Sequence, residues 1–161
     1  MNRDNDIVRA LGFVALYAAY VEESVDVVME RLALVKEITD KERRWPISRK
    51  IDWCIQVLES LKSKELDQLI TLLNETKDAL ENRNEVIHGR IYAGNERSDN
   101  LKSGRSGIPE REVTADELYD LAENLFQLQA AVPNINSFAT MRAIANNSAK
   151  LGDNLEGKKN E

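Results

Sequence analysis

Apolar residues recur at steps of three and four along most of the chain, a spacing that places side chains on one face of an α-helix. The first such segment predicts a helix from about residue 6 to residue 35. Its apolar stripe consists of Ile7, Leu11, Val14, Ala18, Val21, Val25, Val28, Leu32 and Val35. The run from Ala10 to Val21 is apolar throughout, so we expect this half of the helix to be buried on more than one face.

Two more helices are predicted between residues 46 and 92. Pro46 suits the first turn of the second helix, where a missing N–H costs nothing. The second stripe consists of Ile47, Ile51, Cys54, Leu58 and Leu61. Because Cys54 lies on this stripe, we interpret it as a small core residue and not as a nucleophile. Ser63 suits the N-cap of the third helix, whose stripe consists of Leu66, Leu69, Ile70, Leu73, Leu80, Ile87 and Ile91.

Residues 93–113 are polar and contain Gly94, Gly104, Gly107 and Pro109, which predicts a long loop, with short strands at its edges as an option. Thr114 and Glu117 have the spacing of a capping box and begin the fourth helix. That helix continues to Val132, where Pro133 should kink or break it. A further helical segment is expected from residue 135 to residue 144, and the tail at 147–161 is expected to be disordered.

Together these elements predict an all-α fold, a four- to five-helix antiparallel bundle with a long loop before the last long helix. An amphipathic helix cannot bury its stripe alone, and packing against other helices is the simplest solution. The 161 residues, with only seven glycines and three prolines, fit a single helical domain over residues 1–146.

Charge and cysteine content narrow the function. The net charge of −6 argues against a general nucleic-acid coat protein. A single cysteine cannot form an internal disulfide, which favours a reducing, cytoplasmic location. One histidine and one cysteine cannot make a zinc site, so we expect no metal and no cofactor. The apolar run of the first helix is too short to span a bilayer, so no membrane association is expected.

The segment from Arg83 to Gly89 is where we expect chemistry. Asn84 and His88 lie four residues apart and share a helix face, whereas Arg83 lies about 140° away from His88 around an ideal helix. Gly89 can end the helix, or the helix can continue to Tyr92. Arginine can hold a phosphate with two parallel N–H bonds, and histidine can transfer a proton near neutrality.

A fixed cation beside a titratable imidazole suits metal-free RNA cleavage. In that reaction a base takes the proton of the 2′-hydroxyl, the 2′-oxygen attacks the adjacent phosphate, a cation stabilises the pentavalent transition state, and an acid protonates the leaving 5′-oxygen. Two proton-transfer groups are needed, and this chain has one histidine, His88. A symmetric dimer would supply two.

Arg83-Asn84, three intervening residues and His88-Gly89 resemble the signature of the HEPN superfamily, in which Arg and His are separated by four to six residues and Asn commonly follows the Arg. The resemblance implies a dimeric helical bundle with a composite cleft, and a metal-independent endoribonuclease acting as a toxin or in phage defence. It implies that Arg83 stabilises the phosphate, that His88 is the acid or base, and that Asn84 positions them. One toxin branch has a regulatory Tyr two residues after the His. Here that residue is Arg90, and the nearest Tyr is Tyr92.

Several basic side chains are candidates for RNA binding. Those of the loop are Arg90, Arg97, Lys102 and Arg105, and those near Trp45 are Arg43 and Arg44. The alternative function is a non-catalytic HEPN-like dimer that binds a partner protein or a nucleotide. A third hypothesis is that the protein is itself an antitoxin or an immunity-like partner. For the first hypothesis, an antitoxin or another regulatory protein is a possible partner.

Overall fold

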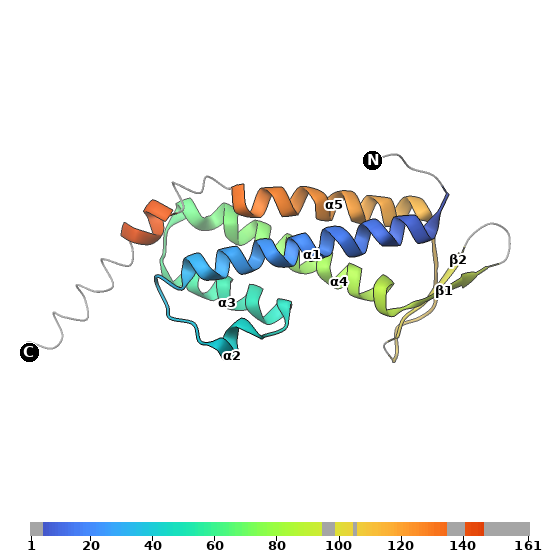
Figure 1. Ribbon diagram of the computed structural model, residues 1–161, viewed down its shortest axis with the longest axis horizontal. Coiled ribbons are helices and arrows are strands. Elements are labelled where there is room, and N and C mark those ends of the chain that lie inside the picture. The colour runs from blue at the N-terminus through green and yellow to red at the C-terminus, as the bar shows by residue number, and fades with distance from the viewer. Residues whose placement is uncertain (1–4, 95–98, 105, 135–140, 147–161) are drawn as a thin grey trace, which may run out of the picture. The chain divides into compact units, whose positions relative to one another are not determined.

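The computed structural model describes residues 5–94, 99–104, 106–134 and 141–146 (Figure 1). The chain forms two compact units. The first contains residues 1–21 and 76–129, and the second contains residues 22–75 and 130–161. The described residues are mostly helical, as the apolar periodicity predicted, with one small three-stranded sheet.

Helix α1 (Ile7–Leu32) confirms the first predicted helix. It begins after Asp6, whose Oδ1 accepts hydrogen bonds from the backbone N–H of Val8 at 3.0 Å and of Arg9 at 3.1 Å. This carboxylate satisfies two of the donors that the first turn leaves open. The buried apolar residues of α1 follow the expected stripe from Val14 to Leu32 and are Ala10, Val14, Ala18, Val21, Val25, Val28, Met29 and Leu32, and Ser24 is also buried.

Two helices of the second unit follow α1 directly along the chain. The short helix α2 (Asp40–Arg43) lies between the first and the second predicted helix, and a capping box formed by Thr39 and Glu42 starts it. Helix α3 (Ile47–Ser60) follows Pro46 as expected. Cys54 is fully buried in it, and burial raises the pKa of its thiol to about 12. The interpretation of Cys54 as a core residue is therefore confirmed.

Helix α4 (Asp67–His88) begins after the 3-10 turn η1 (Lys64–Leu66), for which Ser63 is the N-cap residue. The expected stripe is correct as far as Leu80 but wrong at its end. Val86 is buried, and Ile87 is 38 % exposed. The buried face also includes the small Ala79 and the polar Thr76. A stripe traced only through large apolar residues therefore ends one residue out of phase.

The predicted long loop contains an antiparallel sheet, so the option of short strands there is confirmed. Its strands are β1 (Arg90–Ala93), β2 (Asp99–Lys102) and β3 (Arg111–Val113), in the order β1-β2-β3. Leu101 and Val113 are buried, so the sheet contributes to the core of the first unit. The all-α prediction is confirmed for most of the described residues, and this small sheet is the exception, because its short strands are stabilised by pairing with each other and not by a local helical repeat.

Helix α5 (Ala115–Asn134) starts as predicted, since Thr114 Oγ1 accepts a hydrogen bond from the Glu117 N–H at 3.2 Å. It ends one residue after Pro133, where a break was expected. Residues 141–146 are helical. The predictions for residues 135–140 and for the tail at 147–161 lie outside the described residues. Among the described helices, none is long and apolar enough to cross a membrane.

Candidate functional site

The candidate site lies where α4 ends and β1 begins. Of the two alternatives left open by the sequence, the structure has the shorter helix, because His88 is the last residue of α4 and β1 starts at Arg90. Gly89 is needed here for space. A Cβ at Gly89 would lie 2.5 Å from Cδ1 of Leu101 and 2.7 Å from the carbonyl oxygen of Glu85. Glycine therefore lets β2 approach the end of the helix closely.

Arg83, Asn84 and His88 are positioned by the last turns of α4. Arg83 Nη1 donates a hydrogen bond to Asn84 Oδ1 at 2.9 Å, and both residues are half-buried. His88 is exposed and lies one helical turn after Asn84, on the same face. The amide of Asn84 thus orients the guanidinium of Arg83 on the turn that leads to the imidazole.

Glu85, within the same motif, fixes the helix end to the rest of the first unit. Arg111 of β3 donates from Nε to Glu85 Oε1 at 2.9 Å and from Nη1 to Glu117 Oε1 of α5 at 2.7 Å. The hydrogen bond with Glu85 is the main cause that raises the pKa of Arg111, and Glu117 adds to it. This bridge ties α4, β3 and α5 together and so holds the motif against the sheet.

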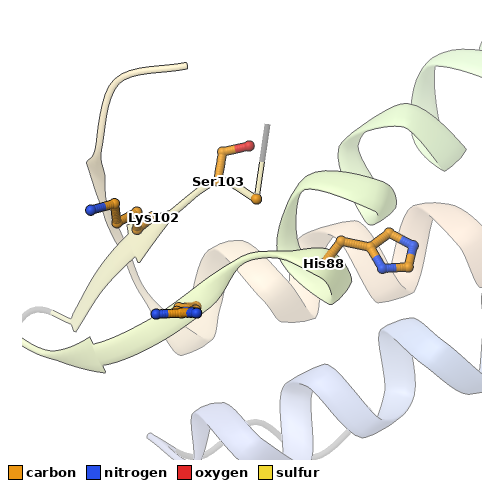
Figure 2. Close-up of a pocket in the computed structure, with 5 residues that line it drawn as sticks. His88, Lys102 and Ser103 are labelled. Carbon is orange, nitrogen blue, oxygen red and sulfur yellow. The ribbon is translucent and has the colours of Figure 1, made fainter. Parts of the chain in front are cut away.

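A pocket of about 400 Å³ opens beside the end of α4 and is lined by His88, Arg90, Lys102, Ser103 and Gly104. It brings together three residues singled out in the sequence, namely His88, Arg90 and Lys102. Ser103 and Gly104 were not expected. Figure 2 shows that the imidazole of His88 points away from Lys102 and Ser103. The pocket therefore adjoins the histidine without enclosing the face of its ring.

Four further residues were predicted to bind RNA, namely Arg97, Arg105, Arg43 and Arg44. Arg97 and Arg105 lie outside the described residues. Arg43 and Arg44 belong to the second unit. Arg43 forms ion pairs with Glu30 and, at 3.9 Å, with Asp40, so much of its charge is already balanced. Arg44 is exposed at the end of α2.

Sequence reasoning missed Ser103 and Gly104 because the pairing of β2 with β1 brings them to the pocket. The sequence signal for that pairing was two apolar residues, Ile91 and Leu101, on either side of a segment with a glycine. These two residues are partners in the β1–β2 ladder. Extending that pairing by one residue places Lys102 opposite Arg90.

Among the residues that the structure describes, no group of three or more His, Cys, Asp or Glu side chains could hold a metal ion. No family model, curated protein or solved structure matches the chain. Function is therefore inferred from the geometry of α4 and the β1–β2 hairpin.

Proposed function

We propose that the protein is a dimeric, metal-independent endoribonuclease of the HEPN type that acts as a toxin or in phage defence. The observation that carries this proposal is the hydrogen bond from Arg83 to Asn84 on the turn before the exposed His88. It supplies an oriented cation close in sequence to a solvent-accessible imidazole, as cleavage by the 2′-hydroxyl requires.

In the proposed reaction, one His88 accepts the proton of the 2′-hydroxyl while the 2′-oxygen forms a bond to phosphorus. The bond from phosphorus to the 5′-oxygen breaks, and the His88 of the second copy donates a proton to that oxygen. Arg83 stabilises the negative charge on the non-bridging oxygens of the pentavalent phosphate. The products are a 2′,3′-cyclic phosphate and a 5′-hydroxyl.

A surface suited to a second copy runs along the first-unit part of α1. We name it the α1 face, and it consists of the exposed residues Val8, Gly12, Ala15, Leu16, Ala19 and Tyr20. Val8 is 73 % exposed, and Leu16 and Tyr20 are each 44 % exposed. A Cβ at Gly12 would meet nothing within 4 Å. A glycine inside a helix lowers the stability of the protein by about 0.5–1 kcal/mol relative to alanine. Close packing of a partner helix against α1 would explain a glycine at this position.

The test is cleavage of RNA by the purified protein in the presence of a metal chelator. We expect products that end in a 2′,3′-cyclic phosphate. His88→Ala should lower the rate about a hundredfold or more, the range of general acid–base catalysis. Arg83→Lys should also impair cleavage, because lysine keeps the charge but loses the planar fork. Asn82→Ala, an exposed change on the same helix, is the matched control and should cleave like wild type.

Absence of RNA cleavage by the wild-type protein, together with equal growth of cells that express wild type and His88→Ala, would rule out this function. The non-catalytic dimer that binds a partner protein or a nucleotide would then be the better description. Cleavage that disappears with the chelator would contradict the metal-independent mechanism in particular.

A further inference from the structure

Two basic side chains lie directly opposite each other in the β1–β2 ladder. Arg90 of β1 and Lys102 of β2 are register partners, and directly opposed residues of an antiparallel pair point to the same side of the sheet, with Cβ atoms about 4.5–5.5 Å apart. Like charges at such positions destabilise the pair. The hairpin therefore carries a repulsion at the end nearest to His88.

The charge of this pair is not balanced within the part of the chain that the structure describes. Both Arg90 and Lys102 are exposed, and no acidic residue described there pairs with either of them. Other cations of the protein do have partners. Lys50 Nζ forms an ion pair with Asp26 Oδ1 at 2.6 Å, and Arg111 forms ion pairs with two glutamates. An anion from outside the described chain would relieve the repulsion between Arg90 and Lys102.

The surroundings of the pair form a shaped pocket. Gly104 makes this possible, because a Cβ there would lie 2.7 Å from the carbonyl oxygen of His88. The absence of a side chain allows the residues after β2 to pass close to the end of α4. Both cations line the resulting cavity of about 400 Å³ together with Ser103. This volume falls within the range of small-ligand sites.

The orientation of His88 limits which phosphate could occupy this pocket. Its ring points away from Lys102 and Ser103 (Figure 2). A phosphate held between Arg90 and Lys102 would therefore not face the imidazole of the same chain. The pocket suits a phosphate that neighbours the one undergoing cleavage.

We infer that Arg90 and Lys102 together bind a single phosphodiester group of the RNA strand, adjacent to the scissile phosphate. This inference rests on the proposed function for the identity of the ligand, whereas the binding of phosphate by the pair stands on the geometry of the hairpin. It assigns the pocket to substrate binding and leaves proton transfer to His88.

The first experiment uses inorganic phosphate as the probe and requires no catalysis. Phosphate should raise the Tm of the wild-type protein relative to chloride at equal ionic strength. The increase should be smaller in Arg90→Gln/Lys102→Gln, which keeps only the general stabilisation that phosphate gives by its exclusion from protein surfaces. In chloride, Lys102→Glu should have a higher Tm than wild type, because an ion pair with Arg90 replaces the repulsion, and phosphate should raise this Tm no more than it raises that of the double variant. An equal phosphate effect in wild type and the double variant would overturn the site.

The second experiment measures the affinity for a short 2′-O-methyl RNA, which cannot be cleaved by 2′-hydroxyl attack. Loss of one phosphate contact lowers the salt slope of single-strand binding by about 0.7. The double variant should therefore bind about tenfold more weakly near 0.05 M salt, with a smaller loss at higher salt. Lys64→Gln removes an exposed cation outside the pocket and is the matched control, with affinity close to that of wild type.

The two proposals fail in distinguishable ways. If wild type cleaves RNA and the double variant binds it as tightly as wild type, the pocket is not a substrate site and the proposed function remains. If wild type cleaves no RNA, but binds phosphate and RNA in a way that the double variant does not, the pocket is an anion site and the proposed nuclease is wrong. A loss near a hundredfold in the double variant would contradict the sharing of one phosphate, because two contacts would then be lost.

Discussion

At the residue scale, Gly89 decides how closely the sheet can approach the end of α4. Gly89→Ala should lower the free energy of unfolding by about 1–3 kcal/mol, because its Cβ must displace the buried Leu101 or the Glu85 carbonyl. Gly12→Ala, in open space within α1, should raise it by about 0.5–1 kcal/mol. Urea unfolding at low protein concentration measures both. A Gly89→Ala protein as stable as wild type would contradict this close contact.

Lys62 lies just after α3 with φ = 51°, in the left-handed region. This conformation costs a residue with a Cβ roughly 1–2 kcal/mol, and glycine avoids most of the cost. We expect Lys62→Gly to raise the free energy of unfolding by about 1 kcal/mol. Gln56→Gly, in the middle of α3, is the matched control and should lower it by about 0.5–1 kcal/mol. Destabilisation by both changes would mean that Lys62 is not under backbone strain.

At the element scale, α2 depends on a titratable cap. Glu42 Oε2 accepts a hydrogen bond from the Thr39 N–H at 2.6 Å, and this bond is the main cause that lowers the pKa of Glu42 below its ordinary value of 4.5. A lowered folded-state pKa stabilises the protein above the unfolded value, and the contribution disappears as pH falls through the folded value. The free energy of unfolding should therefore decrease as pH falls below 4.5 and Glu42 becomes protonated.

The measurement for this cap is the free energy of unfolding from neutral pH to below 4.5, in wild type and Glu42→Gln. Glutamine can still cap the helix but does not titrate, so this part of the pH dependence should be absent from the variant. Glu59→Gln removes the same charge outside the capping box and is the control. Identical pH profiles for wild type and Glu42→Gln would exclude a contribution from the cap.

The helices could be predicted from the sequence because their stabilising pattern is local. The stripe of α1 and the burial of Cys54 follow from helical spacing alone. The sheet could not be predicted in the same way. Its strands have three or four residues, too few for an alternating pattern to stand out, and partners such as Asp99 and Val113 are distant in sequence. Only the register of the folded hairpin places Arg90 opposite Lys102.

The candidate site could likewise be predicted only where its features are local in sequence. Arg83, Asn84 and His88 lie on one helix, so their spacing already indicated which of them share a face, and the Arg83–Asn84 hydrogen bond adds how the cation is oriented. The anchor from Glu85 to Arg111 spans two elements and has no local signal. A sequence motif can thus point to candidate reacting groups, whereas the contacts that hold them depend on the tertiary structure.

At the scale of the whole molecule, the proposed dimer should control the activity. Leu16 is 44 % exposed on the α1 face, and Leu16→Glu would place a charge in the proposed interface, where it could not be buried without a large cost. We expect this variant to be monomeric and to cleave RNA slowly at low protein concentration. Higher concentration should restore cleavage, because mass action rebuilds the composite site. His88→Ala should not recover in this way, since the missing proton-transfer group is absent at every concentration.

Leu34→Glu makes the same change at a position that is 72 % exposed beyond the end of α1, so it should remain dimeric and active. Sedimentation equilibrium and cleavage rates over a range of protein concentrations provide the test, and a fully active monomer would show that one copy of His88 suffices.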